Sequence, residues 1–143
     1  MLARLGELPL LVLLIGISAL AMVVPALHAL ALGLNDLAWE FVFSAIVVAV
    51  AFIILTLATM RMKVHQSPLG HLAGLGLVYL GLPIMLAVPL VDTVPEVGFF
   101  NAYFEMSSAL TTTGATLLDP WLIPEPVHLW RAIVGWIGAF LRA

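Results

Sequence analysis

The sequence predicts an all-α membrane protein that combines transmembrane helices with one re-entrant helix and loop. Of its 143 residues, 64% are hydrophobic and only 9% are charged, and the mean hydropathy is +1.20. Soluble domains carry about 25% charged residues, and a soluble fold of this size could not bury so much apolar surface. Long apolar runs recur along the chain, and one proline- and threonine-rich stretch interrupts them. Lipid is therefore a partner that the composition requires.

Charge and cysteine content exclude several classes of function. The formal net charge is −3, so no basic surface indicates a nucleic-acid partner. The chain has no cysteine, which excludes disulfides, thiolate catalysis and cysteine-ligated metals. The motifs of serine hydrolases and zinc proteases are absent as well, so we expect no enzyme.

Two leading transmembrane helices are predicted in residues 1–62. The first apolar run covers 8–34 and the second about 37–60. Each is near or above the roughly 20 residues that cross a hydrocarbon core of about 30 Å. A signal peptide is the alternative for the first run, because Arg4 and an apolar start precede a small-residue pattern at Ala19. The run continues well past that pattern, which favours a membrane helix.

Residues 63–143 are predicted to form one further unit of helix, loop and helix. Its opening helix covers 71–91, and its closing helix runs from 128 to 143. The closing run is a little short for a full crossing, so we expect the chain to be cut off inside this helix. The segment between them contains a helix-compatible stretch at 99–110 and then Thr-Thr-Thr-Gly-Ala-Thr at 111–116.

That intervening segment is predicted to enter the bilayer and return to the same side. A helix over 99–110 spans roughly 18 Å, about half a bilayer. Extended residues cover about 3.3 Å each, so the residues that follow can reach the surface again. Backbone at this depth is tolerated only where it is buried in protein or lines water. The segment 111–116 is therefore predicted to line an aqueous path.

The residue types in this path suit a hard cation. Peptide carbonyl oxygens can replace the hydration shell of a cation, and oxygen ligands without sulfur or imidazole favour hard metal ions. Gly114 can adopt backbone angles that other residues avoid, which lets successive carbonyls face one axis. The helix over 99–110 ends near the bilayer centre, where its negative dipole end stabilises a positive charge.

These residues resemble a known family. Phe104 and Glu105, followed by Ser-Ser-Ala-Leu-Thr-Thr-Thr-Gly-Ala-Thr at 107–116, look like the first pore loop of the TrkH/KtrB/HKT superfamily of potassium transporters, most of all its TrkH branch. Leu-Trp-Arg at 129–131 and Trp-Ile-Gly at 136–138 also match. The resemblance implies a pore-forming subunit of a Trk-type K⁺ uptake system, in which 99–110 is the pore helix and 111–116 is the filter.

The resemblance assigns roles to eight residues. It implies that K⁺ is the transported ion and that the backbone of Thr111, Thr112, Thr113 and Gly114 coordinates it. It also implies that the protein needs no organic cofactor. A glycine at the position of Gly114 accompanies potassium selectivity in the family, and serine there accompanies sodium in some members. The filter is expected to be supported by four neighbours: Glu105, Ala115, Thr116 and Arg131.

Two of these neighbours have competing interpretations. Glu105 is the one acid within a segment that is predicted to be buried, where an acid is a functional candidate. We favour a bracing role through backbone hydrogen bonds, since a carboxylate ligand would hold a permeating ion too tightly. Arg131 either pairs with an acid of the loop or extends to the membrane interface, and the sequence does not favour one over the other.

The sequence departs from the family in length. The family fold has four helix–pore loop–helix units around one pore, and this sequence holds only the first. One filter strand cannot encircle an ion. The alternative is therefore a truncated, non-conducting fragment that acts only as a membrane scaffold or remnant. The resemblance further implies a homodimer and a cytosolic nucleotide-binding regulatory subunit similar to TrkA.

Charge placement predicts the orientation. The basic residues Arg4, Arg61, Lys63 and Arg142 share one side if each helix crosses once, and basic residues mark the cytoplasmic side. This predicts a multi-pass protein of the bacterial inner membrane with a cytoplasmic N-terminus. Six acids fall on the opposite side, where they would raise the local cation concentration: Asp36, Glu40, Asp92, Glu96, Asp119 and Glu125.

Overall fold

The computed structural model describes residues 9–59 and 68–141, and within them every regular element is a helix. Three stretches are long and apolar enough to cross a membrane: Leu10–Ala31, Asn35–Thr59 and Leu72–Thr93. The prediction of an all-α membrane protein is confirmed.

The first apolar run forms two helices in line, α1 (Leu10–Ala21) and α2 (Val23–Ala31). Pro25 has no N–H, so the carbonyl of Ala21 lacks its helical donor and the regular pattern breaks at Met22. The interruption is small, because the N–H of Met22 still donates to the carbonyl of Ser18 over 3.1 Å. The two pieces together make one span of 22 residues.

The remaining elements follow in the predicted order. Two long helices come next, α3 (Asn35–Thr59) and α4 (Pro68–Thr93). The short turn η2 (Pro95–Val97) then leads into α5 (Gly98–Leu110). A second short turn, η3 (Pro120–Leu122), precedes α6 (Glu125–Phe140).

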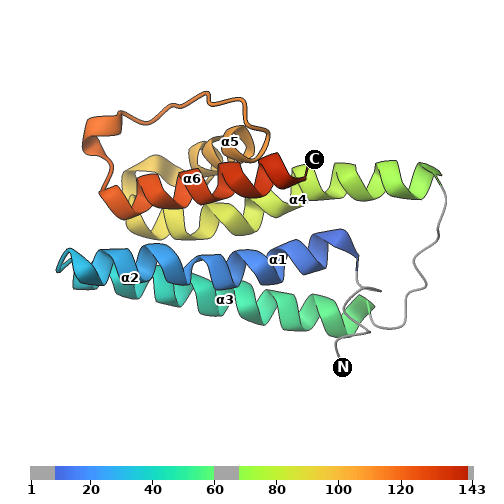
Figure 1. The fold of residues 1–143 in the computed structure, drawn as a ribbon, viewed down its shortest axis with the longest axis horizontal. Helices are drawn as coiled ribbons and strands as arrows, with labels where there is room; N and C mark the ends of the chain where they lie inside the picture. Colours follow the sequence, from blue (N-terminus) through green and yellow to red (C-terminus); the bar gives the residue numbers. More distant parts are fainter. Residues whose placement is uncertain (1–8, 60–67, 142–143) are drawn as a thin grey trace.

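The long helices lie side by side with alternating direction (Figure 1). The segment after α5 runs back to the end of the bundle at which α6 begins, so α5 and this segment form a hairpin (Figure 1). The α2–α3 turn, the end of α4 and the start of α6 meet at that same end. There they line a cavity of about 490 Å³ that includes Gly33, Glu40, Thr93 and Pro124.

Helix α4 is central to the packing. It contacts α1 and α3 on one side and α5 and α6 on the other. Its Leu82, Leu86 and Leu90 are fully buried beside Trp130 of α6 and Met106 of α5. By contrast, α3 exposes a long row of apolar side chains that suits lipid contact: Trp39, Phe43, Ile46, Ile53, Ile54 and Leu57.

The residues on which the predicted orientation depends lie outside the described ranges. These are Arg4, Arg61, Lys63 and Arg142. The cytoplasmic N-terminus therefore stays a prediction, as does the signal-peptide alternative, which depends in part on Arg4. The division of the chain into leading helices (1–62) and a pore unit (63–143) also remains an interpretation.

Candidate functional site

The C-terminus of α5 is closed by a turn in which threonine takes the place usual for glycine. The N–H of Thr112 donates to the carbonyl of Ala109, and the N–H of Thr113 donates to the carbonyl of Ser108, each over 2.9 Å. This pair of bonds defines a Schellman cap, whose left-handed position favours glycine. Thr112 occupies it with φ +54°. For a β-branched residue this backbone conformation is strained by about 1–2 kcal/mol.

A second left-handed residue follows two positions later. Gly114 has φ +76°, and nothing lies within 4 Å of the place where a side chain would begin. Residues 113–117 form neither helix nor strand, and 112–117 are exposed. Within the described part of the chain, no hydrogen bond reaches the carbonyl oxygens of Thr112, Thr113 or Gly114. The three carbonyls are therefore available to a ligand.

The carbonyl of Ala115, by contrast, is hydrogen-bonded within the protein. It accepts a hydrogen bond from the hydroxyl of Ser108 over 2.7 Å, which ties the returning segment to α5. Nearby, the hydroxyls of Thr111 and Thr113 lie 2.8 Å apart, and Thr111 also donates to the carbonyl of Ser107 over 2.8 Å. The side chains of Thr111 and Thr113 thus bond to each other, and that of Thr111 also bonds to α5.

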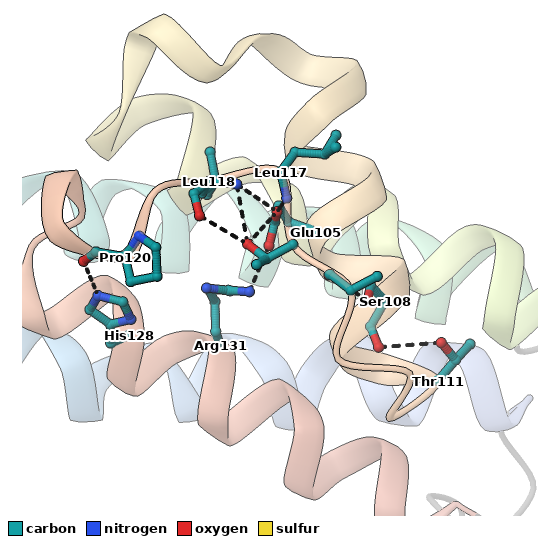
Figure 2. Close-up of polar contacts among 10 residues, drawn as sticks. Glu105, Ser108, Thr111, Leu117, Leu118, Pro120, His128 and Arg131 are labelled. Carbon is teal, nitrogen blue, oxygen red and sulfur yellow. Dashed lines mark hydrogen bonds and ion pairs between the residues drawn. The ribbon is translucent and has the colours of Figure 1, made fainter.

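Glu105 holds the end of the returning segment (Figure 2). Its side chain is completely buried, and its Oε1 accepts from the backbone N–H of Leu117 and, over 3.3 Å, from that of Leu118. The hydroxyl of Thr116 donates to the same oxygen over 2.9 Å. These are the backbone contacts that the bracing interpretation of Glu105 requires.

Arg131 of α6 approaches the other carboxylate oxygen (Figure 2). Its Nη2 lies 2.8 Å from Oε2 of Glu105, and only 19% of the arginine side chain is exposed. The negative charge of Glu105 is therefore compensated by a positive one at contact distance. Of the two interpretations of Arg131, the structure contains the ion pair with an acid, and this acid lies on the helix that precedes the loop.

Helix α6 also comes very close to the end of α5. A side chain at Gly138 would overlap the carbonyl oxygen of Leu110, whereas one at Gly135 would meet the carbonyl of Ala109 at 3.7 Å. Beside this contact lies a groove of about 740 Å³ between α6 and the loop. Its lining includes Thr112, Gly114, Ala115 and Arg131, so four of the eight predicted site residues border one space.

Ser108, Tyr103 and Trp130 are contact residues whose roles the sequence did not reveal. Ser108 is part of the motif at 107–116 with no role assigned to it, yet its hydroxyl donates to the carbonyl of Ala115. Tyr103 and Trp130 donate to carbonyls of α4. A serine near a helix end and two aromatic donors carry no spacing signal by which sequence alone could assign these partners.

Among the described residues, no group of three or more His, Cys, Asp or Glu side chains is placed to hold a metal ion.

Comparison with known proteins agrees with the resemblance seen in the loop. The chain is 31% identical over 105 residues to the Trk system potassium uptake protein TrkI of Halomonas elongata. The match covers 71% of this chain but 21% of that protein, so the chain spans about a fifth of the length of the curated relative it matches. No family model matches the chain, and no solved structure matches it. The chain is thus a membrane protein related to Trk-type potassium transporters.

Proposed function

We propose that this chain takes part in potassium transport across the membrane and supplies one strand of the selectivity filter. The observation that carries the proposal is the set of carbonyl oxygens at Thr112, Thr113 and Gly114, which no hydrogen bond within the described residues occupies. Backbone carbonyls at membrane depth need a partner. A dehydrated K⁺ ion is a partner that such oxygens satisfy.

The surroundings of these carbonyls favour a cation that binds and leaves again. Helix α5 ends at Leu110, so its partial negative charge points at the loop. The carboxylate of Glu105 is buried, hydrogen-bonded and paired with Arg131, and is therefore not a ligand. An ion in the loop would meet peptide dipoles and hydroxyls rather than a full negative charge. Binding by dipoles alone keeps the release of the ion fast.

The two left-handed residues support a common direction for the carbonyls. In an ordinary extended segment, successive residues point to opposite faces. Positive φ at Thr112 and Gly114, with Thr113 between them, departs from that alternation. We propose that this backbone turns the oxygens of residues 111–114 toward one axis, with Ala115 and Thr116 tied back to α5 as support.

Other strands must complete the filter, because one strand cannot surround an ion. Further pore units of a longer protein, or other copies of this chain, are the candidates. By family resemblance we extend the proposal to a homodimer in the bacterial inner membrane, with its N-terminus in the cytoplasm. A cytosolic nucleotide-binding subunit is the regulatory partner that the same resemblance suggests.

The test is a pair of glycine substitutions with the same backbone demand. Gly114→Ser is expected to lower the preference for K⁺ over Na⁺, measured by ion uptake in cells that lack their own potassium transporters and express the protein carrying this chain. Gly33→Ser is the control, because Gly33 has φ +75°, has equally open surroundings and lies in the α2–α3 turn. A preference unchanged in Gly114→Ser, or lowered equally in both variants, would contradict the proposal.

A further inference from the structure

Helix α4 contains two prolines, Pro83 and Pro89, within one continuous helix. A proline has no N–H, so the carbonyl four residues before it lacks its helical donor, and the kink that the ring causes also weakens the helical bond to the next carbonyl. In lipid, such groups need a donor from a neighbouring helix. Each proline therefore creates a place where another helix can be attached to α4.

Both places are occupied by aromatic donors. The hydroxyl of Tyr103 on α5 donates to the carbonyl of Leu80 over 3.0 Å, three residues before Pro83. The indole N–H of Trp130 on α6 donates to the carbonyl of Leu86 over 3.1 Å, three residues before Pro89. The spacing between donor, acceptor and proline is the same in both cases. The two helices that flank the loop are thus each bonded to one proline turn.

The two attachment points differ in height and direction along α4. Leu80 and Leu86 are six residues apart, which corresponds to about 9 Å along a helix axis and about 240° around it. One point faces α5 and the other faces α6. A hydrophobic contact between smooth helices allows sliding, whereas a hydrogen bond to a fixed carbonyl does not. Trp130 is also fully buried, so its N–H has no alternative partner in water.

From this arrangement we infer that Tyr103 and Trp130 are positioning residues, which fix the depth of α5 and α6 in the membrane through the proline turns of α4. The loop between α5 and α6 is held at the height set by these two bonds. Its carbonyls consequently lie at a defined depth along the ion path. This inference rests on the proposed function where it concerns ion selection, and on the structure alone where it concerns depth.

The two tyrosines of the chain provide a matched pair for the first test. Tyr103→Phe removes only the donating hydroxyl, while Tyr79→Phe removes a hydroxyl that makes no hydrogen bond within the described residues. The chain has no native cysteine, so Phe100→Cys introduces a unique label on an exposed position of α5. Tyr103→Phe should change the labelling rate by a membrane-impermeant maleimide about fivefold, the factor that one hydrogen bond contributes. Tyr79→Phe should leave the rate unchanged.

Double-mutant cycles test whether the prolines are involved. Pro83→Ala restores the N–H that pairs with the carbonyl of Tyr79 and relieves the kink in the turn that contains Leu80, so Tyr103→Phe should lower the unfolding temperature less in that background than in the original chain. In a Pro89→Ala background the effect of Tyr103→Phe should be undiminished. Trp130→Phe should show the reverse dependence, with Trp136→Phe as its exposed control. Additive effects in all four combinations would overturn the inference.

Transport measurements separate this inference from the proposed function. If the protein moves K⁺, Tyr103→Phe should lower the preference for K⁺ over Na⁺, and Tyr79→Phe should not. A lowered unfolding temperature with unchanged labelling and unchanged ion preference would reduce Tyr103 to a structural contact and refute the positioning role. If the original protein moves no K⁺, the proposed function fails, and the labelling rates and mutant cycles alone decide the inference about depth.

Discussion

Arg131 on α6 and Glu105 on α5 form a buried ion pair, with Nη2 and Oε2 at 2.8 Å. The other carboxylate oxygen of Glu105 holds the returning segment through Thr116 and Leu117. One carboxylate therefore connects both the loop and the closing helix to α5. Because the arginine compensates its charge, the completely buried carboxylate can accept several hydrogen bonds at once.

The first prediction concerns this ion pair. Arg131→Met should destabilise the protein by about 3–5 kcal/mol, because the carboxylate of Glu105 would remain buried without its counter-charge. The measurement is thermal unfolding of the purified protein in detergent. Combining Arg131→Met with Glu105→Leu should cost less than the sum of the two single variants, since the double variant leaves no buried charge. Strictly additive losses would mean that the two side chains do not interact.

The second prediction concerns the contact of α6 with the end of α5. Gly138→Ala should destabilise the protein by about 1–3 kcal/mol, because its Cβ would overlap the backbone carbonyl of Leu110, which cannot rotate away. Gly135→Ala is the control on the same helix. Its Cβ would sit at an ordinary distance of 3.7 Å from the carbonyl of Ala109, and alanine favours helix by about 0.8–1 kcal/mol over glycine. Equal losses in both variants would show that close approach is not the cause.

The sequence was sufficient to predict the three long apolar spans, because each depends on local apolar length. The span of α3 and the position of α5 follow from runs of apolar residues bounded by Asn35, Gly98 and the threonines. The break at Met22 follows from Pro25, one residue whose local effect outweighs the pattern around it. Apolar length and composition alone do not predict this break, whereas the missing N–H of Pro25 does.

The contacts within the site were less predictable, because they depend on how helices distant in sequence are placed. Glu105 stood out as a rare buried acid, yet its partner Arg131 is 26 residues away in sequence and had an equally good explanation at the interface. Thr112 gave no sign of its left-handed backbone, since β-branched residues avoid it. Only the cap of α5 requires it. The ion pair arises from tertiary structure, and the left-handed threonine arises from the hydrogen bonds that cap α5.

The third prediction compares two adjacent serines of α5. Ser108→Ala should cost about 0.5–1.5 kcal/mol, because the hydroxyl that holds the carbonyl of Ala115 is lost. Ser107→Ala should be neutral or stabilising, because the Ser107 hydroxyl is buried and has no hydrogen-bond partner among the residues that the structure describes. Unfolding temperatures of the two variants provide the measurement. If the ranking were reversed, the bond between Ser108 and Ala115 would not be formed in the membrane.

The fourth prediction concerns the strained cap at Thr112. Glycine adopts φ +54° without the steric penalty of about 1–2 kcal/mol that a residue with a Cβ carries there, but it adds about 0.4–1 kcal/mol of unfolded-chain entropy. Thr112→Gly should therefore be neutral to slightly stabilising.

Thr113→Gly is the control, because Thr113 has no positive φ and its hydroxyl contacts that of Thr111, so this variant should lower the unfolding temperature. If Thr112→Gly destabilises the protein as much as Thr113→Gly does, the left-handed cap is absent from the folded protein. A preserved K⁺ preference in Thr112→Gly would further indicate that the backbone of this residue, rather than its side chain, takes part in the filter.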